Sequence, residues 1–346
     1  MAKTKERRFV HRILFVIVII TAYMLMGRYA PIMPHIQVPA EPVIADPLFQ
    51  FAGQDFYITN TMTTTFIAMF LIILLAFSIR RQLKRGDMIL TGLAGVTSAI
   101  LEGFYNMTES TAGKWARKIF PYFATIFLLV FVVNIMELLP GIDTIGVLRE
   151  AEPGHHGFAV KEEEIFGLFT VNAIQEVEDT GEHHGDEQLF AFYPYFRVAS
   201  TDLNFTISLA LISVVMTQVI GIQALGASYL SKYWDTKGIK KAGKQKGFGN
   251  VMDFIISLVK WFASVLEIVA EFSKILSFTF RLFGVIFAGS VLLFFIGSMV
   301  GTFGQTLVLF LELLFGPLQA FVFGMLTMVF MSMATHSHGD HEEEAN

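Results

Sequence analysis

The sequence predicts an all-α polytopic membrane protein with about five to six membrane helices, and three observations lead to this prediction. The chain has 346 residues, of which 54% are hydrophobic and 16% are charged, whereas soluble domains carry about 25% charged residues. The charges gather in short loops between long uncharged runs, which is typical of a chain that crosses a bilayer several times. Cysteine is absent, so disulfides and thiol catalysis are excluded.

Residues 1–55 are predicted to form an N-terminal signal or anchor helix followed by a Pro-rich outer segment. The basic stretch 1–12 precedes an uncharged run, 13–26, which is short for a membrane span. This run is interpreted either as a signal peptide, with residues 1–28 removed, or as a first membrane helix. If it is retained, the N-terminus is expected in the cytoplasm because basic residues precede the run.

Residues 56–140 are predicted to hold the first spans and an amphipathic connecting helix. The uncharged run 56–79 ends in Arg and Lys residues, which mark the cytoplasmic side. Apolar residues then recur at helical spacing between 87 and 112, which indicates a helix at the membrane surface or packed on its neighbours. A second span is predicted at 119–139.

Residues 141–200 are predicted to form an acidic outer loop insert. Twelve carboxylates lie between Asp143 and Glu187, and they either concentrate cations near an inlet or simply form a solvated loop. Residues 203–230 are predicted to span back, because the lysines between 232 and 246 place the next loop in the cytoplasm.

The last third of the chain is apolar but interrupted by charges. As one helix, residues 252–298 would be roughly 70 Å long at ~1.5 Å per residue, about twice the ~30 Å thickness of the hydrocarbon layer. The segment is therefore expected to be strongly tilted, bent, or a hairpin that lies in the membrane next to the last helix. Residues 336–346 form a His-rich acidic tail, expected in the cytoplasm.

Arg281 is the first candidate functional residue, because it lies deep in an apolar stretch. An arginine in hydrocarbon costs ~2.5–3.5 kcal/mol on insertion scales, and it does not deprotonate in proteins. Its charge therefore needs a carboxylate partner, a water-filled cavity or a partner subunit. An internal ion pair with Glu267 or Glu271 is the alternative interpretation.

Two further groups of polar residues interrupt the apolar helices. Glu267, Glu271 and Lys274 share one helical face, which indicates either a local salt bridge or an aqueous proton path that leads toward Arg281. Glu312 and Gln319 are two turns apart on one face. A carboxyl group in an apolar span is protonated or hydrated, so Glu312 is either a proton relay or a residue at the membrane interface.

Other kinds of site are not predicted. Seven of the nine histidines lie in polar acidic segments without the spacing of a defined metal site, so no metal and no cofactor are expected. The sequence lacks a phosphate-binding loop, a zinc-protease motif and a nucleophile elbow. The chain is therefore not expected to hydrolyse ATP by itself, and nucleic acid is not expected as a partner.

Four segments resemble one known family. RLFGVIFAG (281–289), within SKILSFTFRLFGVIFAGSVLL (273–293), resembles the signature helix of the F-type ATP synthase a subunit, the membrane proton-channel subunit of the Fo sector. LQAFVFGMLTMVFMSMA (318–334) is similar to the last helix of that family. The segments at 120–140 and 200–212 are similar to its earlier spans, and the resemblance covers roughly residues 85–335.

The resemblance implies a role for each matched residue. Arg281 matches the essential stator arginine, which faces a ring of c subunits that each carry a membrane carboxylate. Glu267 matches an acidic position, and residues 201–335 are the proton-channel helices. This chain departs from the family at two positions: Ser290 stands where some bacterial members carry Glu, and Glu312 stands where those members carry His. The acidic group is thereby moved to the facing helix.

The expected function is that of the stator proton-channel subunit of a rotary ATP synthase in a bacterial plasma membrane. Arg281 would separate an inner half-channel near Glu267 and Glu271 from an outer one. The outer half-channel would be lined by Glu312, Gln319, Ser290, Asp202 and Asn204. The expected partners are the c-subunit ring, b-type peripheral stalk subunits, the rest of the F1Fo complex and membrane lipid. The alternatives are a self-contained ion-coupled secondary transporter, a non-conducting scaffold, or Na⁺ as the coupling ion.

Overall fold

The structure is a computed structural model, and its described residues divide into two compact units. One unit holds the described residues between 143 and 195, and the other holds those of 38–142 and 196–346. The described residues are 40–44, 47–51, 53–85, 90–139, 142, 145–150, 158–165, 169–176, 190–226, 229, 233, 249–300 and 302–336. The expected signal or anchor helix and most of the His-rich tail lie outside these ranges.

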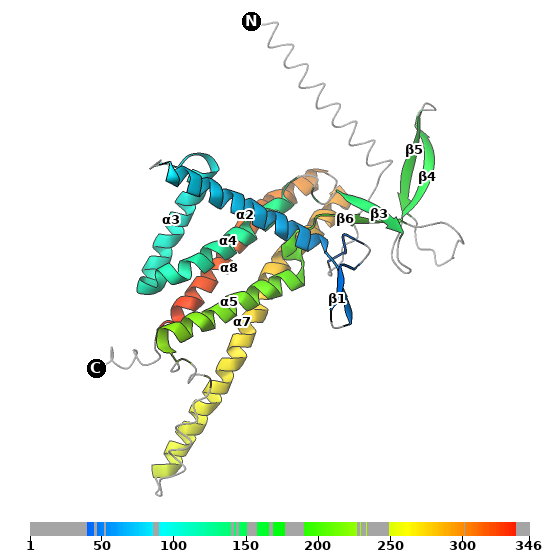
Figure 1. Ribbon diagram of the computed structural model, residues 1–346. Coiled ribbons are helices and arrows are strands. Elements are labelled where there is room, and N and C mark those ends of the chain that lie inside the picture. Colours follow the sequence, from blue (N-terminus) through cyan, green and yellow to red (C-terminus); the bar gives the residue numbers. More distant parts are fainter. Residues whose placement is uncertain are drawn as a thin grey trace. The chain divides into compact units, whose positions relative to one another are not determined.

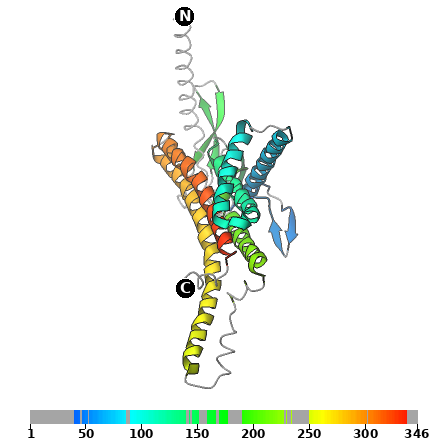
Figure 2. The same cartoon turned by 90° about the vertical axis from the view of Figure 1, so that its left-hand side faces the viewer.

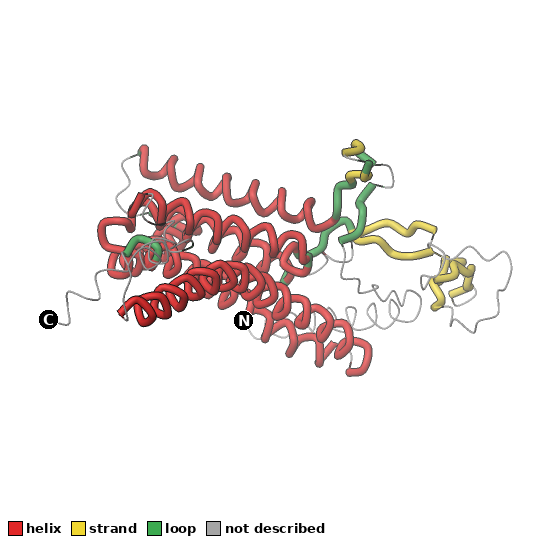
Figure 3. Tube along the Cα trace, turned by 90° about the horizontal axis from the view of Figure 1, so that it is seen from below, coloured by secondary structure: helices red, strands yellow, loops and turns green. Residues whose placement is uncertain are grey.

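The second unit is almost entirely helical (Figures 1 and 3). Five of its helical stretches are long and apolar enough to cross a membrane, which confirms the predicted all-α polytopic fold. The helices are α2 (Asn60–Lys84), α3 (Gly92–Ala112), α4 (Ala116–Glu137), α5 (Leu203–Leu225), α7 (Gly249–Val300) and α8 (Thr302–Met333), with short 3₁₀ turns η1 (Gly113–Trp115) and η3 (Ala199–Thr201).

Helix α2 begins and ends where its sequence provides capping groups. The side chain of Thr59 accepts a hydrogen bond from the backbone N–H of Met62, which satisfies one of the free donors of the first turn. Arg81 and Lys84 occupy the last turn, where cations stabilise the partial negative charge of a helix end. Most of the apolar side chains between these ends are exposed, as expected for a helix that faces lipid.

Helix α3 packs on its neighbours, which is one of the two alternatives predicted for 87–112. Leu93 and Val96 are exposed and form an apolar surface. The ring of Phe104, in contrast, lies about 5 Å from those of Phe123 and Phe127 on α4. Gly113 then adopts a left-handed φ of 52°, which a residue without a side chain adopts readily, and the chain turns into α4.

The core lies among α4, α5, α7 and α8, and glycines bring α4 and α8 close together. A Cβ atom on Gly324 would lie 2.8 Å from the ring of Phe123, and one on Gly316 would lie 3.3 Å from the Cβ of Asn134. Phe123 is completely buried. Small residues allow this close approach, because association within a membrane depends on van der Waals packing.

Helix α7 is one continuous helix of 52 residues, about 78 Å long at ~1.5 Å per residue. Its N-terminal part extends beyond the ends of α5 and α8 (Figures 1 and 2). The stretch 252–298 therefore contains no hairpin of its own. The chain reverses after Val300, and α8 runs back alongside α7 (Figure 2). The two helices together form the long hairpin of this fold.

The strands account for a smaller part of the chain. In the helical unit, β1 (Phe49–Phe51) and β2 (Gln54–Phe56) form an antiparallel hairpin. The other unit contains an antiparallel sheet with the strand order β3-β6-β4-β5. Its strands are β3 (Gly146–Glu150), β4 (Phe158–Ile165), β5 (Phe169–Glu176) and β6 (Phe190–Pro194). The insert predicted as a loop thus has regular structure of its own.

Candidate functional site

Arg281 lies near the middle of α7 and is only partly satisfied by the described residues. Its Nη1 atom is buried and has no hydrogen-bond partner among them. Its Nη2 atom donates to the Oγ of Ser277 at 3.4 Å, a long contact. The described residues form no ion pair with Arg281, so the alternative of an internal pair with Glu267 or Glu271 is not realised.

The two sides of α7 differ around Arg281. Phe278 and Leu282 are buried against the core. Ser277 and Gly284, one turn on either side of Arg281, are exposed. A Cβ atom added to Gly284 would meet nothing within 4 Å. The guanidinium group therefore borders an open strip of small residues, against which another helix can approach closely.

A carboxyl cluster, formed by Glu137, Ser290 and Glu312, lies toward the C-terminal end of α7. The Oγ of Ser290 donates to Oε1 of Glu137 at 2.5 Å, which joins α7 to α4. Glu312, on α8, lies close to Gly289 of α7: a Cβ atom added to Gly289 would be only 2.9 Å from Oε1 of Glu312. Both carboxyl groups are 9% exposed, and they lie against consecutive residues of α7.

Asn134 extends the polar contacts one turn back along α4. Its Oδ1 accepts a hydrogen bond from the Oγ of Ser200 at 2.6 Å, and its Nδ2 donates to the carbonyl of Gly316 on α8 at 3.1 Å. Asn134 and Ser200 are buried. The amide thus uses both its acceptor and its donor to hold η3, α4 and α8 together.

Asp202 is the centre of a third group at the start of α5. Its Oδ2 accepts from the hydroxyl of Thr61 at 2.8 Å, and its Oδ1 caps α5 by accepting from the backbone N–H of Asn204 at 2.9 Å. Asp202 and Thr61 are buried. The side chain of Asn204 is exposed, so it does not join this cluster.

Glu41 is a buried carboxyl group beside the start of α2. The Nδ2 atom of Asn60 donates to Oε2 of Glu41 at 3.4 Å, and the backbone N–H of Glu41 donates to Oδ1 of Asn60 at 3.3 Å. Burial raises the pKa of Glu41 above its ordinary value, and the nearby charge of Arg197 acts in the opposite direction. Glu41 therefore holds its proton more tightly than an exposed glutamate does.

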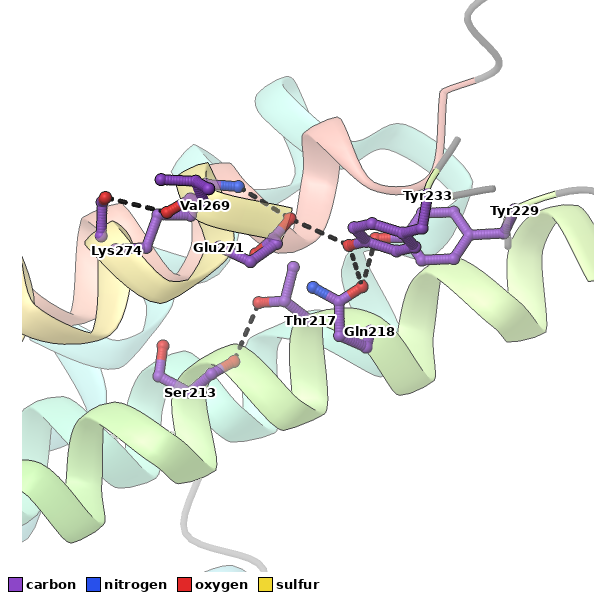
Figure 4. Close-up of polar contacts among 9 residues, drawn as sticks. Ser213, Thr217, Gln218, Tyr229, Tyr233, Val269, Glu271 and Lys274 are labelled. Carbon is purple, nitrogen blue, oxygen red and sulfur yellow. Dashed lines mark hydrogen bonds and ion pairs between the residues drawn. The ribbon is translucent and has the colours of Figure 1, made fainter. Parts of the chain in front are cut away.

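A tyrosine cluster, formed by Gln218, Tyr229, Tyr233, Glu271 and Lys274, lies beside α7 on the N-terminal side of Arg281 (Figure 4). Lys274 forms an ion pair with Oε1 of Glu271 at 3.0 Å, which is the local salt bridge that the sequence indicated. The hydroxyl of Tyr233 lies 3.1 Å from the same oxygen and 2.7 Å from Oε1 of Gln218. Tyr229 donates to Gln218 at 2.9 Å.

The structure brings some of the predicted site residues together and not others. Ser290 bonds to Glu137, Glu312 lies against the adjacent Gly289, and Glu271 belongs to the tyrosine cluster. Glu267 is half-buried one turn before Glu271, and Gln319 is buried two turns after Glu312. Among the described residues, no three His, Asp or Glu side chains are placed to hold a metal ion.

Several residues of these clusters were not singled out from the sequence. The sequence indicates Glu137 only as the end of a span, although Asn134 lies one turn before it in the uncharged stretch 119–136. That i, i+3 spacing on one face was the available signal. Tyr229 and Tyr233 carried no comparable signal, because aromatic residues next to a basic loop are common at membrane interfaces.

Comparison with known proteins identifies the family. The profile of the family described as ATP synthase A chain matches residues 62–332. A protein named ATP synthase subunit a from Pseudoalteromonas atlantica is 28% identical over 303 residues, which cover 83% of this chain and 92% of that protein. Its namesake from Nitratiruptor sp. is 26% identical over 295 residues, which cover 84% of this chain and 97% of that protein. The chain belongs to the ATP synthase A chain family.

Proposed function

We propose that this chain is the stator proton-channel subunit of a rotary ATP synthase. In this proposal, protons reach and leave the carboxylates of a c-subunit ring through two half-channels, and Arg281 keeps the half-channels apart. The observation that carries the proposal is the position of Arg281. It lies between two buried polar clusters on one helix, with one guanidinium nitrogen that the described residues leave without a partner.

The spacing along α7 supports this arrangement. Glu271 precedes Arg281 by ten residues and Ser290 follows it by nine, which correspond to about 15 Å and about 14 Å along the axis. The tyrosine cluster and the carboxyl cluster are thus separated by roughly the thickness of the hydrocarbon layer. A proton that moves between them must pass Arg281, whose permanent charge repels it.

The carboxyl cluster is proposed to line the outer half-channel. Polar contacts link Thr61 with Asp202, Ser200 with Asn134, and Ser290 with Glu137. Glu312 lies against Gly289, the residue before Ser290 on α7. Groups of this kind inside a membrane protein mark ion and proton pathways. A proton that reaches Glu137 or Glu312 is then passed to a ring carboxylate across the open strip of α7.

The inner half-channel is proposed to run along Glu267 and Glu271. When the ring turns, a protonated ring carboxyl group meets Arg281, whose charge stabilises the ionised form and so drives the proton off. The proton then leaves past the acidic face of α7. One charge that crosses ~100 mV yields about 2.3 kcal/mol, so several protons are needed for each ATP.

The remaining assignments follow from the family and from the charge pattern. The partners are the c-subunit ring, b-type peripheral stalk subunits, the other subunits of the F1Fo complex and membrane lipid. The basic loops, including the one after α5, are placed in the cytoplasm by their lysines. The protein would then lie in a bacterial inner membrane with both retained termini in the cytoplasm.

The test compares Arg281→Ala with wild type in inverted membrane vesicles that contain the assembled complex. ATP-driven proton pumping should be lost, while the passive proton leak is unchanged or higher. Arg117→Ala is a matched control, because Arg117 is an exposed arginine in the first turn of α4; it should pump normally. Intact pumping by Arg281→Ala in complexes of normal abundance would refute the proposal.

A further inference from the structure

The hydroxyl group of Tyr233 lies within hydrogen-bond distance of two side-chain oxygens but has only one hydrogen to donate. Its oxygen lies 2.7 Å from Oε1 of Gln218 and 3.1 Å from Oε1 of Glu271, and Figure 4 shows it between these two groups. A phenol has one hydrogen to donate. It therefore donates to one of these oxygens at a time, and the contact with the other requires that the other group supply the hydrogen.

Two hydrogen-bond arrangements satisfy this geometry. In the first, Tyr233 donates to Gln218, and a protonated Glu271 donates to Tyr233. In the second, the amide of Gln218 is turned by 180°, which exchanges Oε1 and Nε2 without a change in shape. Gln218 then donates to Tyr233, and Tyr233 donates to an ionised Glu271.

The environment of Gln218 allows both arrangements. Its Nε2 is buried and has no hydrogen-bond partner among the described residues, so no hydrogen bond on the nitrogen side fixes the orientation of the amide. On the other side, the hydroxyls of Tyr229 and Tyr233 both contact one atom of the amide. Each hydroxyl can donate to an oxygen there or accept from a nitrogen.

We propose that Tyr233 is a positioning residue for proton release at Glu271, and that it reverses the direction of its hydrogen bond when Glu271 gives up its proton. This inference rests on the proposed proton-channel function. The proton leaves the carboxyl group of Glu271 for the aqueous exit. The hydroxyl hydrogen of Tyr233 turns from Gln218 to the new carboxylate, and Tyr233 stays neutral throughout.

The surroundings of Glu271 suit this role. Its side chain is 13% exposed. Among the described residues of α7, the charged groups nearest to it by contact or spacing are Lys274, which forms the ion pair, and Glu267, which is one turn earlier. From the segment after α5 Glu271 meets Tyr233, and α5 itself contributes the uncharged Gln218. Lys274 and a donating Tyr233 both favour the ionised carboxylate, whereas burial and Glu267 oppose it.

Tyr229 provides a matched control. Its ring packs on Gly221, where a Cβ atom would lie 2.4 Å from the ring. Its hydroxyl contacts Gln218, whereas the hydrogen bond to Glu271 comes from Tyr233. Tyr229→Phe and Tyr233→Phe each remove one hydroxyl from the same amide. They differ in whether the hydroxyl that is lost also contacts the carboxyl group.

The experiment measures ATP-driven proton pumping against the pH of the medium, in inverted vesicles and per assembled complex. In this direction protons enter from the medium through the inner half-channel. Tyr233→Phe removes both the acceptor for the protonated carboxyl group and the donor to the carboxylate. Because the hydrogen bond to the charged form is the stronger of the two, Glu271 retains its proton at higher pH. The alkaline limit of pumping should move up by about 0.5–1 pH unit, the size expected for one hydrogen bond. Tyr229→Phe should leave this limit at its wild-type pH.

Two results would overturn the inference: equal profiles for Tyr233→Phe and wild type, or equal shifts for both tyrosine variants. If Tyr233→Phe does not assemble, Glu271→Gln is measured instead. Because it removes the titrating carboxyl group, it should lower pumping at every pH, and a wild-type pH profile would also overturn the inference. The proposed function is tested separately: if Arg281→Ala stops pumping while the tyrosine variants agree with wild type, the function stands and only the role of Tyr233 falls.

Discussion

Replacement of Gly289 by alanine tests whether the position of the Glu312 carboxyl group sets the rate of proton transfer. The added Cβ atom would lie 2.9 Å from Oε1 of Glu312, with the Cγ at 3.4 Å. An ordinary contact begins near 3.4 Å, so the carboxyl oxygen must move by about half an ångström. The side chain is flexible enough to do this, and we therefore expect the fold to survive the change.

The expected functional loss follows from this displacement. A misplacement of ~1 Å costs up to ~100-fold in rate where geometry controls the reaction, so a shift of half that size should slow pumping about tenfold. The assay is ATP-driven proton pumping in inverted vesicles, normalised to the amount of assembled complex. Gly103→Ala is the control, because a Cβ atom on Gly103 meets nothing within 4 Å.

The control also separates helix propensity from carboxyl displacement. Alanine in place of glycine inside a helix stabilises it by about 0.5–1 kcal/mol, and both variants gain this contribution. Gly103→Ala should therefore pump at the wild-type rate. If Gly289→Ala pumps as fast as Gly103→Ala, the position of the Glu312 carboxyl group does not control proton transfer, and its place in the outer half-channel is wrong.

Two further predictions concern stability. Burial raises the pKa of Glu41, so its contribution to stability is complete below the ordinary glutamate pKa of 4.5 and is lost as the pH rises through the native pKa. Glu41→Gln should therefore improve Tm relative to wild type more at pH 8 than at pH 4. Parallel Tm–pH curves for the two proteins would contradict this. Gly324→Ala places a Cβ atom 2.8 Å from the ring of Phe123, so it should lower the free energy of unfolding by about 1–3 kcal/mol. A melting temperature equal to that of Gly103→Ala would disprove the tight packing of α4 on α8.

The hydropathy pattern located the spans because bilayer thickness fixes their length. The runs predicted at 56–79, 119–139 and 203–230 overlap α2, α4 and α5 closely. The acidic insert was different. Its strands β4 and β5 are rich in charged and polar residues, and the strong charge of the segment concealed its capacity to form a sheet.

Residues of the candidate site were predictable only where one charged side chain carries a free-energy cost in its own apolar segment. Arg281 and Glu312 stand out because a charge in an apolar run needs compensation. The contact between Ser290 and Glu137 joins residues 153 positions apart, and neither residue alone predicts it. The same holds for Tyr233 and Glu271, 38 positions apart. Pairings of this kind depend on which helices pack together, and the period of one helix does not specify its neighbour.

The Nη1 atom of Arg281, which has no hydrogen-bond partner among the described residues, also has a consequence for assembly. A chain that inserts alone leaves this charge without compensation from its described residues, at a cost of ~2.5–3.5 kcal/mol on insertion scales. A partner that supplies a carboxylate recovers that free energy, which corresponds to a factor of roughly 100 in an association constant. The arginine would then help to recruit the partner as well as to direct its protons, and an uncharged residue at this position would weaken the complex before any proton moves.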